Sequence, residues 1–388
     1  MTKLTTVQAL RAVAALLVAI YHLFLNEQAG ITNNGSDEVS ALLEATRNGF
    51  AGVDMFFVIS GFIMVYVTQN TAHGKFSSLD FLIARLARIY PLWWCYCACF
   101  LVIIFAGTGQ LTPASYSIAA EETASFLVRS FLLWPQEKLP YIVVGWTLIH
   151  ELYFYVVFAG FLLAPRAWMP VLAGVWCVVL SIGAVAGLST DQAATGILTL
   201  VFHPLTLEFI FGLGVGLLVT RGIRTLALPA LALGTGIFVG GLLFFSHDMV
   251  ELSLNWSRII LFGVPSALIL YGLVSLELEK GWSAPSQLVY LGDASYALYL
   301  GHVVIYLVAI KGFELVAAIS TQLGLPAWLT AAFSLGHPGL MDNLLFAVLA
   351  FSGALICASL TFSLLEKKSL VWLSGKRRAL MQQLGMHG

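Results

Sequence analysis

Residues 7–27 read VQALRAVAALLVAIYHLFLNE, a mostly apolar run as long as a helix that crosses a bilayer. Such a helix needs roughly 20 residues, because each residue adds about 1.5 Å to its length. Nine more runs of this kind follow, near residues 51–70, 89–108, 145–164, 168–188, 196–220, 225–246, 257–276, 293–311 and 343–365. The sequence therefore predicts an all-α fold, a polytopic membrane bundle of about ten transmembrane helices.

The composition of the whole chain agrees with a membrane protein. Of its 388 residues, 59% are hydrophobic and 10% are charged, and the mean hydropathy is +0.90. A soluble domain has about a quarter of its residues charged. The net charge of −1 gives no basis for a nucleic-acid partner. We expect one integral-membrane domain over residues 1–370 and a short basic cytoplasmic tail over residues 371–388.

Lysine and arginine are divided unevenly between the two sides that ten spans create. Thirteen fall on the side of the N-terminus and five on the opposite side. The five are Arg47, Arg129, Lys138, Arg258 and Lys311. Because cytoplasmic loops are enriched in positive charge, we expect cytoplasmic termini and a multi-pass protein of the cytoplasmic (inner) membrane. The short apolar stretch 124–135 is expected to be interfacial or re-entrant, since an eleventh span there would reverse every later helix.

Small residues inside the spans are interpreted as packing elements. The pairs Gly212/Gly216 and Gly236/Gly240 have the G-x-x-x-G spacing typical of closely packed membrane helices. The five cysteines lie in apolar runs without metal-ligand spacing, so we expect small buried hydrophobic side chains and no metal site.

Ionisable side chains inside a span are costly and therefore mark candidate functional sites. Arg11 and His22 are 11 positions apart on one helix, a spacing that returns within about 20° of the same face. They stand roughly 16 Å apart along the axis. A cation near the cytoplasmic end and a near-neutral base in the outer half suit a long, phosphate-headed donor molecule. A histidine bonded to a neighbouring helix is the alternative.

The second and third spans add an acid, a hydroxyl and two arginines. In GVDMFFVISGF, residues 52–62, Asp54 lies near the outer entrance and Ser60 deeper. Asp54 also suits the start of an interfacial helix, and Ser60 lacks the G-x-S-x-G elbow of a nucleophile. Arg85 and Arg88, three positions apart, are suited to bidentate phosphate binding, although any inner loop attracts arginine.

The fourth span opens with a polar and aromatic segment. It holds Trp146, Thr147, His150, Glu151, Tyr153 and Tyr155. Helical spacing puts Trp146 and His150 on one face, and Thr147, Glu151 and Tyr155 on the adjacent face. Glu151 is placed to orient a histidine, as the third member of a catalytic triad does, or to bind sugar hydroxyls beside the aromatic rings. A purely structural bond to another helix is the alternative.

Two later spans also carry polar groups. Glu208 lies near mid-membrane, and Ser295, Tyr299 and His302 line one face of the ninth span. For these four residues, a structural role in hydrogen bonding between helices and a functional role are equally supported by the sequence.

Taken in order along the chain, these segments resemble integral-membrane acyltransferases of the acyltransferase-3 family, most closely the exopolysaccharide O-acetyltransferase branch. The matching segments are residues 10–22, 52–62, 85–91, 146–151, 207–209 and 295–302. Members of that family have about ten transmembrane helices and acylate glycans, lipids or antibiotics across the membrane. The resemblance implies an O-acyltransferase that moves an acyl group, expected to be acetyl, from cytosolic acyl-CoA to a glycan hydroxyl.

The resemblance and the positions of the polar residues in the spans together give the expected roles. His22 is expected to be the catalytic histidine, with Arg11 and Glu151 as catalytic partners. Acetyl-CoA, the acyl donor, is expected to bind through Arg85, Arg88, Arg11 and Ser60, with no metal. Residues expected to line the acceptor site are Asp54, Trp146, His150, Tyr153, Glu208, Tyr299 and His302.

Two readings from other functional classes remain. Midplane carboxylates and histidines also serve a proton-coupled transporter or a flippase of a polysaccharide-assembly system. Such proteins often show broken helices in two related halves, and the sequence has no such repeat. The other reading is a non-catalytic membrane subunit of a polysaccharide synthesis complex.

Overall fold

The computed structural model describes residues 3–33, 35–36, 38–188, 196–245, 256–335 and 340–383. Helices make up its regular structure over these ranges. Those that match the ten expected spans are α1 (Thr5–Asn33), α3 (Ala51–Val67), α4 (Lys75–Thr108), α6 (Gly145–Phe161), α7 (Met169–Val185), α8 with α9 (Ile197–Val201 and Thr206–Thr220), α10 (Ala227–Phe244), α11 to α12 (Trp256–Lys280), α14 (Ser295–Gln322) and α16 (Leu340–Thr361).

Nine helices in the described part of the chain are long and apolar enough to cross a membrane. The tenth expected span, α6, has 17 residues and is therefore about 26 Å long. The expected fold class, an all-α bundle of membrane-spanning helices, is confirmed. The side of the membrane that holds the termini stays a prediction.

Further helical elements lie between the spans and after the last one. They are α2 (Ala41–Thr46), η1 (Ala114–Tyr116), η2 (Ala120–Glu122), α5 (Thr123–Phe131), η3 (Arg166–Trp168), α13 (Ser286–Asp293), α15 (Ala327–Ala332), η5 (Phe362–Glu366) and α17 (Lys367–Gln383). The apolar stretch 124–135 begins in α5 and continues past its end, and the nine residues of this helix are too few to cross a bilayer.

Glycines set the closest helix contacts in the bundle. A Cβ atom on Gly61 would collide with the Phe209 carbonyl, and one on Gly212 would collide with the Val58 carbonyl. Gly216 packs in the same way on Val65. The expected packing role of Gly212 and Gly216 is thus confirmed, because both lie where α9 crosses α3.

The expected packing role of Gly236 and Gly240 is wrong. Neither has a neighbouring atom within 4 Å of an added Cβ. Helix α10 instead contacts the α11–α12 segment through Gly234 and Gly241, which meet Pro265 and Phe262. Gly234 and Gly241 are seven residues apart and therefore share one face of α10. Gly236 and Gly240 lie on other faces of the helix. Burial of the cysteines was also only partly right, since Cys97 is buried and Cys99 is exposed.

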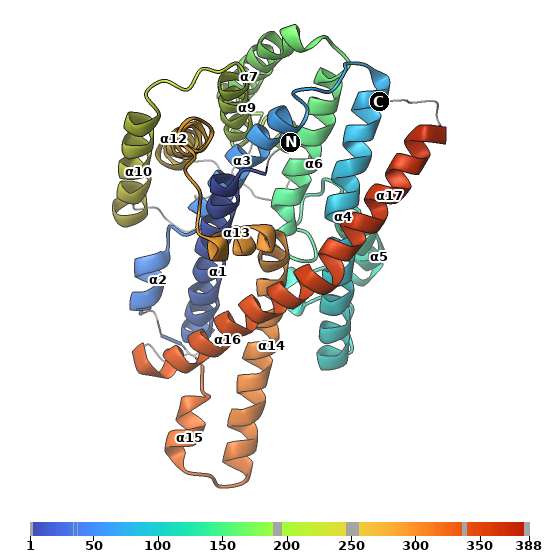
Figure 1. The fold of residues 1–388 in the computed structure, drawn as a ribbon. Coiled ribbons are helices and arrows are strands. Elements are labelled where there is room, and N and C mark those ends of the chain that lie inside the picture. Colours follow the sequence, from blue (N-terminus) through green and yellow to red (C-terminus); the bar gives the residue numbers. More distant parts are fainter. Residues whose placement is uncertain are drawn as a thin grey trace.

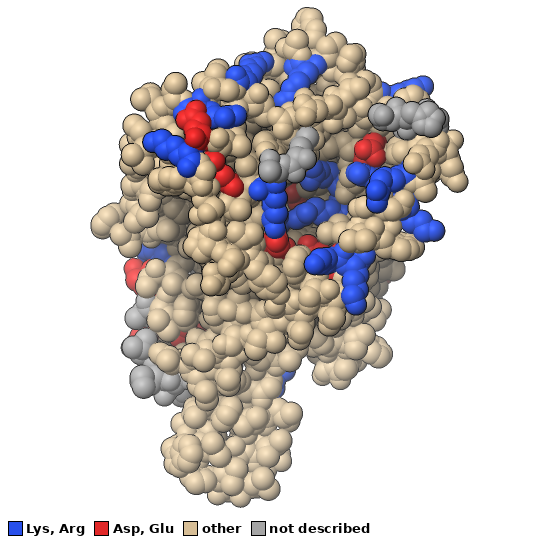
Figure 2. Space-filling view, viewed as in Figure 1, with Lys and Arg blue, Asp and Glu red and all other residues tan. Residues whose placement is uncertain are grey.

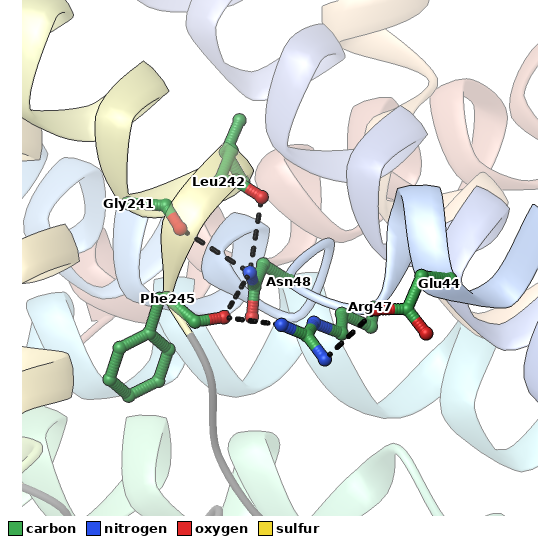
Figure 3. Close-up of polar contacts among 6 residues, drawn as sticks. All are labelled: Glu44, Arg47, Asn48, Gly241, Leu242 and Phe245. Atoms are coloured by element: carbon green, nitrogen blue, oxygen red, sulfur yellow. Dashed lines mark hydrogen bonds and ion pairs between the residues drawn. The ribbon is translucent and has the colours of Figure 1, made fainter.

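The end of α10 is held by the segment that joins α2 to α3 (Figure 3). The Asn48 amide donates to the carbonyls of Gly241, Leu242 and Phe245, at 3.3, 3.1 and 2.9 Å. Arg47, which pairs with Glu44 at 3.4 Å, also donates to the Phe245 carbonyl. The last carbonyls of a helix lack partners within the helix, so these two side chains cap α10.

The last helical segment runs obliquely across the bundle, through α16, η5 and α17 (Figure 1). An ion pair of 3.5 Å between Arg377 and Asp80 ties α17 to α4. Helix α17 continues without a break through residue 371, where the expected tail begins, and residues 384–388 lie outside the described part.

Charged side chains gather at one end of the molecule. On the face drawn in Figure 2, Lys, Arg, Asp and Glu cluster in the half where the chain ends lie, partly around a hollow below the N-terminus. The opposite end, formed by the hairpin of α14 and α15, shows almost no charge on this face. A charge distribution of this kind is typical of a membrane protein with one basic side.

Candidate active site

A cavity of about 390 Å³ lies among α1, α3, α4, α6 and α14. Its lining is mixed, with aliphatic and aromatic residues beside charged ones. The polar and tyrosine side chains on its wall are Lys3, Gln8, Arg11, Ser60, Tyr66, Arg85, Arg88, Thr147, Glu151, Tyr155, Ser295, Tyr296 and Tyr299. The four residues expected to bind the donor, Arg11, Ser60, Arg85 and Arg88, all line this one cavity.

Three arginines from two helices give the cavity a cationic end. Arg11 and Arg88 are close enough for their charges to interact, and Arg11 Nη1 donates to Gln8 at 3.2 Å. The Arg85 guanidinium lies over the rings of Phe81 and Tyr155, at 5.2 and 5.7 Å. The Nε atom of Arg85 is buried without a hydrogen-bond partner among the described residues. These guanidinium groups have the geometry and charge that bind phosphate.

Glu151 is held beside the arginines. Its Oε1 atom accepts hydrogen bonds from Ser60 at 2.9 Å and from Tyr155 at 2.5 Å. Its charge interacts with those of Arg11 and Arg85. The Ser60 hydroxyl therefore orients a carboxylate, and that carboxylate balances the arginines.

A hydrogen-bonded group lies on the cavity wall one helical turn beyond Glu151 and Tyr296. The hydroxyls of Thr147 and Tyr299 lie 2.8 Å apart. Both also lie within hydrogen-bond distance of the Val144 carbonyl, at 2.9 and 3.2 Å. Phe56 packs edge-on against the Tyr299 ring, with 5.7 Å between centroids. We call Thr147, Tyr299 and Phe56 the end wall.

A pair of histidines lies behind the end wall. The rings of His22 and His302 are 5.1 Å apart, and the ring of Tyr299 is 6.1 Å from that of His302. Neither histidine lines the cavity. On α14, Ser295, Tyr296 and Tyr299 reach the wall, whereas His302 comes one turn later.

The backbone sets the tautomer of both histidines. His22 Nδ1 lies 2.9 Å from the Val18 carbonyl, and His302 Nδ1 lies 3.0 Å from the Leu298 carbonyl. A carbonyl only accepts hydrogen bonds, so Nδ1 carries a proton in both rings, and Nε2 is the position that gains or loses one. The Nε2 atom of His302 is buried without a hydrogen-bond partner in the described part of the protein. In its neutral form, each ring therefore has its free lone pair on Nε2, where it can act as a base.

Asp54 and Glu208 belong to a buried ionic group outside the cavity. Arg258 binds Asp54 through Nε–Oδ1 and Nη2–Oδ2 contacts of 2.8 and 3.0 Å. The Glu208 side chain is 0% exposed and lies within electrostatic range of both Asp54 and Arg258. Arg258 was counted from the sequence among outer-loop charges, and its role as the partner of Asp54 was missed. The sequence did contain a signal for this role, because Arg258 is a lone arginine at the start of an apolar run, as Arg11 is.

The remaining aromatic candidates also lie off the cavity wall. His150 is buried against Phe57, Trp146 and the unforeseen His203, with ring distances of 6.1, 5.6 and 4.6 Å. Tyr153 accepts a hydrogen bond from Trp176 and donates one to the Val201 carbonyl. The two-face division of α6 is nevertheless confirmed, because Thr147, Glu151 and Tyr155 line the cavity while Trp146 and His150 do not.

Comparisons with known proteins agree with this geometry. The acyltransferase-3 family model, described as an acyltransferase domain, matches residues 5–363. The chain is 33% identical to the exopolysaccharide production protein ExoZ of Rhizobium meliloti (strain 1021) over 285 residues, which cover 73% of this chain and 83% of that protein. It is 27% identical to the acyltransferase MdmB of Streptomyces mycarofaciens over 327 residues, which cover 77% of this chain and 78% of that protein.

No solved structure matches the chain significantly. The family match spans nearly the whole membrane domain and supports neither a transporter nor a flippase. The chain belongs to the acyltransferase-3 family and is a multi-pass membrane acyltransferase.

Proposed function

We propose that this acyltransferase moves an acetyl group from cytoplasmic acetyl-CoA to a hydroxyl of an exopolysaccharide or related glycan, at the opposite face of the inner membrane. One observation carries the proposal. A single cavity has three arginines at one end, and at the other end a wall that backs onto two histidines. The similarity to an exopolysaccharide production protein supports a glycan acceptor.

Coenzyme A matches the two ends of the cavity. The donor carries its phosphates at one end and its thioester at the other. Phosphates bound by Arg11, Arg85 and Arg88 leave the pantetheine arm to extend between α3 and α6 toward Thr147 and Tyr299. Glu151 balances the arginines when the site holds no donor, because its charge interacts with those of Arg11 and Arg85.

His22 acts as the base in this proposal. Its Nε2 lone pair takes the proton of the acceptor hydroxyl while the hydroxyl oxygen attacks the thioester carbonyl carbon. The new C–O bond forms, the C–S bond breaks, and the coenzyme A thiolate takes the proton from His22. A route through an acyl group carried on His22 uses the same nitrogen. Transfer also needs a movement of Thr147 or Tyr299, since the end wall stands between the cavity and the histidines.

The test is acetyl transfer by the purified protein in lipid nanodiscs, with acetyl-CoA as donor and a de-O-acetylated exopolysaccharide as acceptor. Release of free coenzyme A and acetylation of the glycan are both measured. For His22→Ala we expect transfer to fall by about 10²–10⁴-fold, the usual contribution of a general base, with acetyl-CoA binding retained. The matched control is His73→Ala, because His73 is an exposed histidine between α3 and α4.

A different result would contradict each of the three parts of the proposal: the base, the donor and the acceptor. Equal transfer by wild type and His22→Ala contradicts the role of His22. Absence of acetyl-CoA binding by the wild-type protein contradicts the donor. Binding and hydrolysis of acetyl-CoA without glycan acetylation contradict the acceptor class.

A further inference from the structure

In the structure, which is the state that a binding donor meets, the end wall is held in place by burial and hydrogen bonds. Tyr299 is 6% exposed and Thr147 is 6% exposed, and their hydroxyls bind each other and the Val144 carbonyl. Phe57, which lines the cavity on the same helix as Phe56, stacks on Phe209 at 4.5 Å. Packed aromatic rings of this kind yield little to a larger ligand.

The two ends of the cavity differ in polarity. Tyr296, toward the arginine end, donates to the Ile89 carbonyl at 2.8 Å and lies near the charges of Arg88 and Glu366. At the end wall the lining consists of Phe56, Phe57 and Leu148 around the hydroxyls of Thr147 and Tyr299. The apolar end suits an acyl group, and the charged end suits phosphate.

We infer that Tyr299 and Phe56 set the length of the acyl group that the enzyme accepts. The inference rests on the proposed function and deepens it. With the phosphates held by the arginines, the acyl group is the part of the donor that meets the end wall. Because the wall ends the cavity one turn before His302, a short group fits against it and additional methylenes collide with the Tyr299 and Phe56 rings.

The experiment compares donors of different length. Transfer from acetyl-, butyryl- and hexanoyl-CoA to the same glycan is measured for wild type, Tyr299→Ala and Phe56→Ala in nanodiscs. Wild type should prefer acetyl-CoA. Each truncation should raise the rate ratio of butyryl-CoA to acetyl-CoA by at least about tenfold, since one methylene in an apolar pocket changes specificity by about 10–200-fold.

Two matched controls separate the effect of side-chain size at the end wall from other effects of the substitutions. Tyr299→Phe keeps the ring and loses the hydroxyl, so its donor ratio should stay near that of wild type even where its overall rate changes. Tyr296→Ala removes a tyrosine of the same cavity at the arginine end, and its donor ratio should also be unchanged.

The outcomes separate this inference from the proposed function. If wild type transfers acetyl and both truncations keep the wild-type donor ratio, the inference is wrong and the proposed function stands. If Tyr296→Ala shifts the ratio as much as Tyr299→Ala, the end wall is not the determinant. If wild type transfers no acyl group from any of the three donors, the proposed function itself fails.

Discussion

Asp54 and Arg258, which are 204 positions apart in the sequence, form a bidentate ion pair inside the helix bundle, with Asp54 0% and Arg258 4% exposed. Removing one partner of a buried pair leaves an uncompensated charge, which costs about 3–5 kcal/mol. We therefore expect Arg258→Met to lower the free energy of unfolding by about that amount. Thermal and denaturant unfolding in detergent, followed by circular dichroism, measure the loss.

Two controls accompany this prediction. The double variant Asp54→Leu with Arg258→Met should recover much of the stability, because neither member of the pair is left without the other. Lys311→Gln removes one partner of the exposed pair with Glu314 and should cost at most about 1 kcal/mol. If the single variant Arg258→Met is as stable as the wild type, burial of Asp54 does not depend on its pairing with Arg258.

The glycines of α9 and α10 give a second prediction. Gly212→Ala forces a methyl group onto the Val58 carbonyl of α3, so the two helices must separate. We expect a loss of about 1–3 kcal/mol, as for other overpacked sites. Gly240→Ala is the matched control, because no atom lies within 4 Å of its added Cβ, and it should be neutral or slightly stabilising. Equal unfolding temperatures for the two variants would contradict the contact.

Properties that depend on one helix were predictable from the sequence. Apolar run length indicated the spans, and helical spacing separated Thr147 and Glu151 from Trp146 and His150 on α6. The arginines of α1 and α4 were assigned together as phosphate ligands, and they share one cavity. For the spans and for the faces of α6 a local rule of spacing carries the information, and for the arginines the family resemblance added to it.

Properties that depend on how two helices align were not predictable. The contact of His22 with His302 and the bond between Thr147 and Tyr299 follow from the relative height of helices far apart in the chain. That height is set by packing of many side chains, including close contacts such as Gly52 with the Ala14 carbonyl. Asp54 illustrates the limit, since spacing alone placed it at an entrance while packing buries it against Arg258.

The arginines of the cavity give a third prediction. A hydrogen bond to a charged group contributes about 1.5–3 kcal/mol, so Arg88→Gln should raise the KM for acetyl-CoA by about 10–100-fold and change kcat much less. Arg129→Gln is the control, because Arg129 is exposed on α5 and away from the cavity. Steady-state kinetics over a range of acetyl-CoA concentrations measure both constants. A fall in kcat with unchanged KM would place Arg88 in the chemical step and not in donor binding.

Glu151 gives the last prediction. The structure places its carboxylate within electrostatic range of Arg11 and Arg85, whereas the sequence favoured a role in orienting a histidine or binding sugar. Glu151→Gln keeps the acceptor oxygen for Ser60 and Tyr155 but removes a negative charge near Arg11 and Arg85. Adenosine 3′,5′-bisphosphate, which carries phosphates like those of the donor, should therefore bind about three- to tenfold more tightly. Calorimetric titration measures the affinity, and Tyr155→Phe, which keeps both the ring and the Glu151 charge, should bind like wild type. Unchanged or weaker binding by Glu151→Gln would contradict the charge-balancing role. It would favour the role expected from the sequence, in which Glu151 takes part in the catalytic step.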